Sequence, residues 1–130
     1  MMQRRTLLLA ASGLLAAPAV HAQAAWPSRG SIRLIAQFPP GGLVDTVSRL
    51  MAPFLSSALG QTVLVENRAG AGGVIGTDFV AKAPADGYTL LVSHASVHVF
   101  AAATLPSMPF DPVADFTHIA HLVEAPNVLL

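Results

Sequence analysis

Two adjacent glycines after a proline pair form the strongest candidate for a binding site in this sequence. Gly41 and Gly42 follow Pro39 and Pro40 and lead directly into an amphipathic segment. Glycine lets the backbone approach a ligand closely, and the unpaired N–H groups at the start of a helix favour an anion such as a carboxylate or a phosphate. The same glycines are equally compatible with a simple turn, in which Asp45 only complements the helix dipole. The residues alone leave both interpretations open.

Two further segments carry polar groups that suit ligand binding. Asn67 and Arg68 offer an amide and a guanidinium; alternatively Asn67 caps a turn, and Arg68 is solvated or pairs with a nearby acid. Ser93 and Ser96 flank His94, but no G-x-S-x-G elbow occurs, and adjacency in sequence does not create the geometry of a catalytic triad. This pattern favours hydrogen bonding to a ligand over nucleophilic attack.

The sequence gives little evidence for a site that binds a metal, a nucleotide cofactor or a nucleic acid. The chain has no cysteine, and its paired histidines, at positions 94 and 98 and at 118 and 121, have no acidic partner in a matching motif. The glycines from Gly70 to Gly76 depart from the G-x-G-x-x-G spacing, and no Gly-Lys-Ser/Thr is present. Seven basic residues balance seven acidic ones, so nothing attracts nucleic acid or anionic lipid. The sequence therefore predicts no metal and no cofactor.

The first 22 residues resemble a secretory signal peptide. Arg4 and Arg5 precede an almost wholly apolar stretch from Thr6 to Val20, which is too short to cross a bilayer. Small residues favour cleavage after Ala22, with Ala24 as the alternative, and export by the twin-arginine route is also compatible with the arginine pair. We therefore expect residues 1–22 to be removed and residues 23–130 to fold in the periplasm.

Alternating strands and helices are expected in the rest of the chain. The patterns predict strands at Ile32–Phe38, Thr62–Glu66 and Tyr88–Val92. A helix is expected from about Leu43 to Leu59, with a kink or break near Arg49 because Pro53 interrupts it. A second helix is predicted by its apolar stripe of Val74, Ile75, Phe79 and Val80. Such alternation indicates an α/β fold with a mostly parallel sheet.

Ligands of open parallel sheets bind beyond the carboxyl ends of the strands. The loops 39–45, 67–73 and 93–98 follow the three predicted strands, so we expect them to meet at one edge. Further on, 118–123 suggests another strand, and 127–130 resembles a strand cut off within the element. This abrupt end predicts a chain that is incomplete relative to its fold.

Taken together, the motifs resemble the Bug family, the substrate-binding receptors of tripartite tricarboxylate transporters. The similarity runs in order through most of the chain after the leader, and it is carried by the segments Phe38-Pro39-Pro40-Gly41-Gly42 with Asp45, Glu66-Asn67-Arg68, Gly70-Ala71-Gly72-Gly73 with Ile75-Gly76, Asp86-Gly87-Tyr88-Thr89-Leu90-Leu91, Pro109-Phe110-Asp111-Pro112, Asp115-Phe116 and Pro126-Asn127-Val128-Leu129.

The resemblance implies a periplasmic binding protein of type II, whose two lobes close on a small organic acid for membrane transporter subunits. Residues 23–130 would supply an incomplete first lobe, since members of the family are considerably longer. The ligand-binding residues that it suggests, together with the polar segments above, are Pro40, Gly41, Gly42, Asp45, Asn67, Ser93, His94 and Ser96.

Two other functions are compatible with the sequence. One is a truncated receptor fragment without an independent function, which the abrupt end suggests. The other is an enzyme that holds a phosphorylated or carboxylated substrate at a helix N-terminus. The prediction is a receptor and not an enzyme, because no arrangement of catalytic residues accompanies the candidate site.

Overall fold

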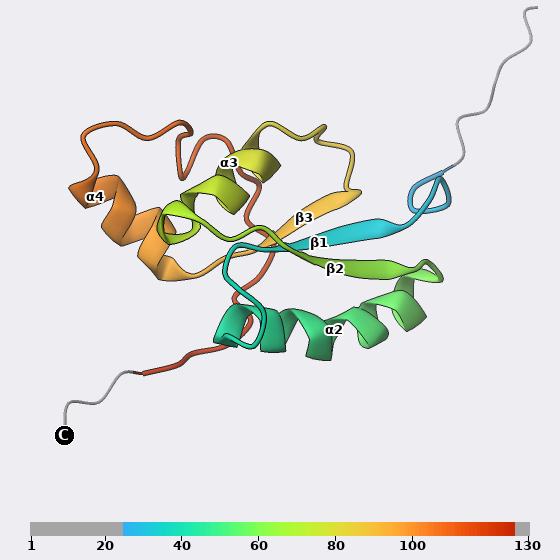
Figure 1. Cartoon of the computed structure of the whole chain (residues 1–130). Coiled ribbons are helices and arrows are strands. Elements are labelled where there is room, and N and C mark those ends of the chain that lie inside the picture. Colours follow the sequence, from blue (N-terminus) through green and yellow to red (C-terminus); the bar gives the residue numbers. More distant parts are fainter. Residues whose placement is uncertain (1–24, 127–130) are drawn as a thin grey trace, which may run out of the picture.

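Three parallel strands form a sheet at the centre of the computed structural model, which describes residues 25–126 (Figure 1). They are β1 (Ile32–Ala36), β2 (Val63–Asn67) and β3 (Thr89–Val92), in the spatial order β2-β1-β3. At the carboxyl end of β1, Ala36 lies opposite Asn67 on one side and Val92 on the other. The predicted parallel α/β sheet is therefore confirmed. The predicted leader and the predicted strand at 127–130 lie outside the described residues.

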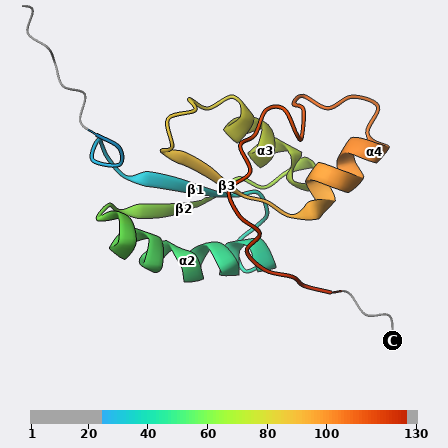
Figure 2. The same ribbon diagram turned by 180° about the vertical axis from the view of Figure 1, so that it is seen from behind.

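Helices cover both faces of this sheet. α2 (Leu43–Leu59) connects β1 to β2 and packs on one face, while α3 (Val74–Ala81) connects β2 to β3 and lies on the other (Figures 1 and 2). A 3₁₀ turn, η2 (Ala71–Gly73), leads into α3. Because both helices return the chain to the amino end of the sheet, the loops that follow the three strands share the opposite edge.

β1 is buried on both faces, as expected for a strand in which Arg33 is the one polar residue. Ile32, Leu34 and Ala36 point toward α2 and form a core with Val44 and Ala52 of that helix. Ile35, on the other face, is also fully buried. The central strand is thus held by apolar contacts on each side, which fixes the position of the loop that leaves its carboxyl end.

The chain after β3 is less regular. η3 (Ser96–Ala101) is a π-helical turn that continues into α4 (Ala102–Thr104). The predicted strand at His118–Val123 is wrong, because the described chain beyond α4 contains no strand, and Ile119 is 78% exposed. A strand needs a neighbour for its hydrogen bonds, and the described part of the chain offers this segment none. Among the described residues, every helix falls short of the length and hydrophobicity needed to span a membrane.

α2 continues without interruption through Pro53, so of the predicted kink or break near Arg49 the break is wrong. Pro53 is exposed, on the side of the helix that faces away from the sheet. Core contacts of Ala52 and Leu55, on either side of Pro53, hold the helix together on its buried side. Tertiary packing therefore outweighs the local cost of the proline.

Replacing Pro53 by alanine should stabilise the protein. The Pro53→Ala variant restores an N–H donor within α2 and relieves the ring's clash with the preceding turn. Because the unfolded chain also regains entropy, we expect the free energy of unfolding to rise by about 2 kcal/mol. Urea denaturation measures this change. Ser57→Ala, at another exposed position of α2, controls for helix propensity alone and should have the smaller effect. A less stable Pro53→Ala chain would contradict the prediction.

Candidate ligand-binding site

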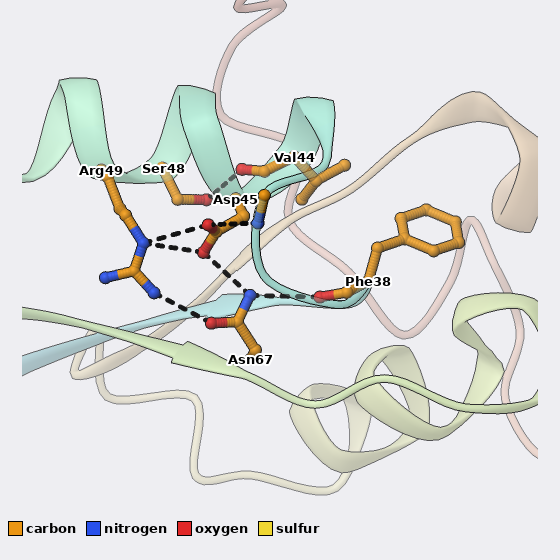
Figure 3. A network of polar contacts seen from close by, with 7 residues as sticks. Phe38, Val44, Asp45, Ser48, Arg49 and Asn67 are labelled. Atoms are coloured by element: carbon orange, nitrogen blue, oxygen red, sulfur yellow. Dashed lines mark hydrogen bonds and ion pairs between the residues drawn. The ribbon is translucent and has the colours of Figure 1, made fainter.

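Asp45 is the centre of a polar network that joins the loop after β1 to the end of β2 (Figure 3). Its carboxylate accepts hydrogen bonds from the Gly41 backbone N–H at 2.9 Å, from Arg49 Nε at 2.9 and 3.0 Å, and from Asn67 Nδ2 at 2.9 Å. Asn67 Nδ2 also donates to the Phe38 carbonyl at 3.1 Å, and Arg49 Nη2 donates to Asn67 Oδ1 at 3.0 Å. The network therefore fixes the loop at both of its ends.

The network also determines the charge state of Asp45. The residue is only 4% exposed, and hydrogen bonds from Arg49, Gly41 and Asn67 lower the pKa of its carboxyl group from 3.8 to about 2. Asp45 is thus ionised at neutral pH, and both oxygens already have protein donors. This arrangement suits the positioning of a loop better than direct contact with an anionic ligand.

The start of α2 has no side-chain cap. Gly42, the residue before the helix, is extended, and Gly41 has φ of +85°, a conformation that L side chains rarely adopt. The Asp45 carboxylate, which could have capped the first turn, instead accepts from Gly41. The first N–H groups of a 17-residue helix are consequently available at the carboxyl edge of the sheet, where they favour an anion.

A depression of about 460 Å³ lies against this helix start. Aromatic, proline and aliphatic side chains supply most of its wall, and His94 and Ser96 add polar groups from the segment after β3. The lining residues are Phe38, Pro39, Pro40, Gly42, Leu43, Val44, His94 and Ser96. Two loops far apart in sequence, 38–44 and 94–96, therefore meet at this place.

His94 presents a defined donor. Its Nδ1 accepts the Ser96 backbone N–H at 3.1 Å and lies 2.9 Å from Ser96 Oγ. Because Nδ1 accepts from the backbone, the proton of the neutral ring is on Nε2. The ring of His94 also contacts Phe38 edge-on, with the centroids 6.3 Å apart. His94 thus supplies an N–H group beside the apolar wall of the depression.

The structure separates the eight predicted site residues into two groups. Pro40, Gly42, His94 and Ser96 line the depression, and Gly41 lies between two lining residues of the same loop. The other three lie behind it: Asp45 and Asn67 belong to the polar network, and the Ser93 hydroxyl donates to Gln37 Oε1 at 3.1 Å. The sequence motifs pointed to the residues of both groups but could not assign them to one group or the other, because hydrogen-bond partners depend on the folded positions of distant segments.

Arg68 adopts the structural alternative considered from the sequence. Its guanidinium carbon lies 3.7 Å from the ring centroid of Phe79 in α3, and its Nη2 lies 3.7 Å from a carboxylate oxygen of Glu66. Both partners lie outside the depression. Arg68 therefore helps to pack α3 on the sheet.

Sequence reasoning overlooked two residues of this region. Arg49 is needed to hold Asp45, and its signal was the i, i+4 spacing from an acid within a helix. Gln37 is fully buried at the end of β1, and its signal was a polar residue at the end of an apolar strand. Within the described residues, no group of three or more histidine, cysteine, aspartate or glutamate side chains is placed to hold a metal ion.

Comparison with known proteins decides the family. The sequence model of the tripartite tricarboxylate transporter family receptor matches residues 47–130. The chain belongs to this receptor family. The chain is 44% identical to the protein BugT of Bordetella pertussis over 130 residues, which cover 96% of this chain and 40% of BugT. It is 42% identical to a UPF0065 protein of Pseudomonas sp. strain P51, with 82% of this chain and 31% of that protein covered.

Solved structures agree with this assignment. The malate-bound MatC protein of Rhodopseudomonas palustris has a TM-score of 0.70 and 38% identity, covering 73% of this chain and 32% of that chain. An adipate-bound protein of R. palustris has a TM-score of 0.63 and 37% identity, covering 67% and 29%. The predicted lobe of a periplasmic binding protein is confirmed. Its relatives are receptors and not enzymes, and this chain spans about a third of their length.

Proposed function

We propose that this chain captures a small carboxylate-bearing metabolite in the periplasm, as part of a receptor for a tripartite tricarboxylate-type transporter. The observation that supports this most directly is the uncapped start of α2 beside the depression. A carboxylate there would accept hydrogen bonds from backbone N–H groups and would interact favourably with the helix dipole. Relatives that bind malate and adipate bind ligands of this chemistry.

The walls of the depression suit the remainder of such a ligand. Phe38, Leu43 and Val44 provide apolar surface for a short carbon chain. His94 Nε2 provides a donor for a second oxygen-bearing group, while the Ser96 hydroxyl donates to His94 Nδ1 and leaves its oxygen as an acceptor. In this proposal Pro40, Gly41, Gly42, His94 and Ser96 contact the ligand, whereas Asp45, Asn67 and Ser93 hold the contacting loops in place.

Export and partners belong to the same proposal. The sequence features of residues 1–22 support removal of a leader and delivery of residues 23–130 to the periplasm. Membrane subunits of the transporter would then receive the ligand. Because the chain spans about a third of its relatives, a second lobe in the complete receptor would bury the ligand further.

Ligand-dependent thermal unfolding tests the proposal. The purified chain is heated with malate, adipate, acetate or citrate, and with the neutral diamide of malate, while Trp26 fluorescence and circular dichroism follow unfolding. A ligand at a hundred times its Kd adds about 2.7 kcal/mol of stability, so one acid should raise the midpoint by several degrees. The neutral diamide should leave the midpoint unchanged. Recovery of the acid unchanged distinguishes a receptor from an enzyme, and absence of any shift contradicts the proposal.

A pair of glycine variants separates ligand binding from folding. Gly41 and Gly60 both have positive φ, at +85° and +63°, and a Cβ at either would meet no atom within 4 Å. Gly41→Ala and Gly60→Ala should therefore destabilise the chain similarly, by about 1 kcal/mol. Only Gly41→Ala should also lose the midpoint shift caused by the acid, because Gly60 lies at the far end of α2.

A further inference from the structure

A cluster of aromatic rings holds the chain after α4 on the turn η3. His98 of η3 packs edge-on against Phe116, with the ring centroids 5.3 Å apart, and Phe116 packs in the same way against Phe110 at 5.7 Å. Phe110 is only 6% exposed. Beyond α4 the described chain contains no helix or strand, so side-chain contacts of this kind keep it in place.

The neutral form of His98 suits this position. Its Nδ1 lies 3.3 Å from the Pro112 carbonyl oxygen, and because a carbonyl only accepts, the proton of the neutral ring is on Nδ1. Protonation at Nε2 therefore adds a charge without adding a bond to Pro112. Burial lowers the pKa of His98 below its ordinary value of 6.5, the bond to Pro112 opposes this shift, and the neighbouring His118 adds to it.

A second imidazole adjoins His98. The ring centroid of His118 lies 6.1 Å from that of His98, and the two ring planes meet at 71°. His98 is half-buried, whereas His118 is exposed. A positive charge on His118 disfavours one on His98, so the pair resists becoming doubly charged while the rings stay together.

The charged groups of the surrounding elements have partners of their own. Asp111 and Asp115, on either side of Pro112, accept backbone N–H groups of their own turn at 2.7 to 2.9 Å. Among the elements packed against η3, η2 and α4 have no charged residue, and Asp78 of α3 pairs with Lys82 at 2.7 Å. The carboxylates near the two imidazoles are thus oriented by their own turn and not by His98 or His118.

η3 connects the aromatic cluster to the depression. It begins at Ser96, which lines the depression, and it is a π-helical turn, a rare conformation that often occurs at functional sites. Val97 is fully buried beside η2, since a Cβ on Gly73 would stand 2.7 Å from Val97 Cγ2. Two consecutive residues of η3 therefore contact different parts of the chain: Val97 packs on η2, and His98 packs on the cluster.

We propose that His98 and His118 form a pH-sensitive latch, which holds the segment 110–118 on η3 at neutral pH and releases it in mild acid. A charged His98 ring would stay half-buried beside His118 in the held segment, whereas release exposes both rings to water. The held state binds fewer protons than the released state, so its stability is complete well above pH 6.5 and is lost as the pH falls below this value. The latch does not depend on the proposed function, although its release would loosen the turn that begins at Ser96.

Hydrogen exchange of the backbone N–H groups of residues 111–115 measures the opening of this segment. After correction for the intrinsic pH dependence of exchange, we expect their protection to fall roughly fivefold between pH 7.5 and pH 5 in the wild-type chain. In His98→Asn the side-chain amide keeps a donor near the position of Nδ1 but does not titrate, so protection should be the same at both pH values. His121→Asn removes an exposed imidazole three residues beyond His118 and should behave like wild type.

A second variant covers the case in which His98→Asn does not fold. His118→Asn removes the neighbouring charge and leaves the bond from His98 to Pro112, so the fall in protection should be smaller than in wild type. Protection that is independent of pH in the wild-type chain, or that falls equally in either folded variant, would overturn the inference. These measurements need no ligand, so failure of the latch and failure of the proposed function are distinguishable.

Discussion

The Gly76→Ala variant should be less stable than the wild-type chain by about 3 kcal/mol. Gly76 lies in α3 where the helix packs against the sheet, and a Cβ at this position would stand 2.5 Å from the Arg68 carbonyl oxygen and 3.0 Å from Gln37 Cα. Both neighbours are backbone atoms, and the Arg68 N–H is itself held by the Ala36 carbonyl at 2.9 Å. The clash can be relieved only if α3 moves away from the segments that follow β1 and β2.

Chemical denaturation tests this prediction, because helix propensity and the clash change the stability in opposite directions. Alanine favours helix over glycine by about 1 kcal/mol, so local propensity alone predicts a more stable Gly76→Ala chain. Gly30→Ala is the matched control, because Gly30 is exposed and an added Cβ there meets nothing within 4 Å. Equal midpoints for Gly76→Ala and the wild type would show that the close approach of α3 to β1 is not needed.

Asp45→Asn should destabilise the chain at neutral pH and weaken ligand binding. The amide cannot accept from Arg49 as an ion and from Gly41 and Asn67 together, so the loop after β1 loses its tether to β2. If one residue of this loop must be ordered anew when the ligand binds, the Kd should rise by roughly tenfold. Calorimetric titration with malate or adipate measures this, with Asp86→Asn, at an exposed acid paired with Arg29, as the control.

The pH dependence of stability follows from the same carboxylate. The pKa of Asp45 in the folded chain is about 2, below its ordinary value of 3.8, so the ionised form is favoured by folding. Its contribution is fully present above pH 4 and is lost as the pH falls toward 2. The difference in melting temperature between wild type and Asp45→Asn should therefore be constant near neutral pH and narrow below pH 4. A difference that stays constant down to pH 2 would contradict this assignment.

Local sequence patterns predicted the regular elements well. The helix expected from Leu43 to Leu59 has those bounds in the structure, and the first three predicted strands each overlap an observed one, as with Ile32–Phe38 and β1. These elements combine strong periodicity with glycine or proline at their ends, so local and tertiary preferences agree. The segment 118–123 has apolar residues but no such agreement, and it forms no strand.

The candidate site was predicted as a set of loops with candidate residues in them, without the role of each residue. Parallel strands necessarily place their following loops at one edge, so the meeting of 39–45 with 93–98 could be expected from the sequence. The sequence could not predict which residues line the depression and which hold the loops in place. Asp45 and Gly41 are four residues apart, but their bond to each other, and the bond of Asp45 to Asn67, depend on how the loop closes against β2.

The sequence by itself determined the fold class, the order of the elements, the receptor family and the glycine turn that leads into α2, because each depends on residues close together in the chain. Only the tertiary structure decided that Asp45 is occupied by protein donors, that α2 continues through Pro53, and that Gln37 is buried at the end of β1. Those features depend on contacts between segments far apart in sequence, where packing and hydrogen-bond geometry outweigh the local preference of any single residue.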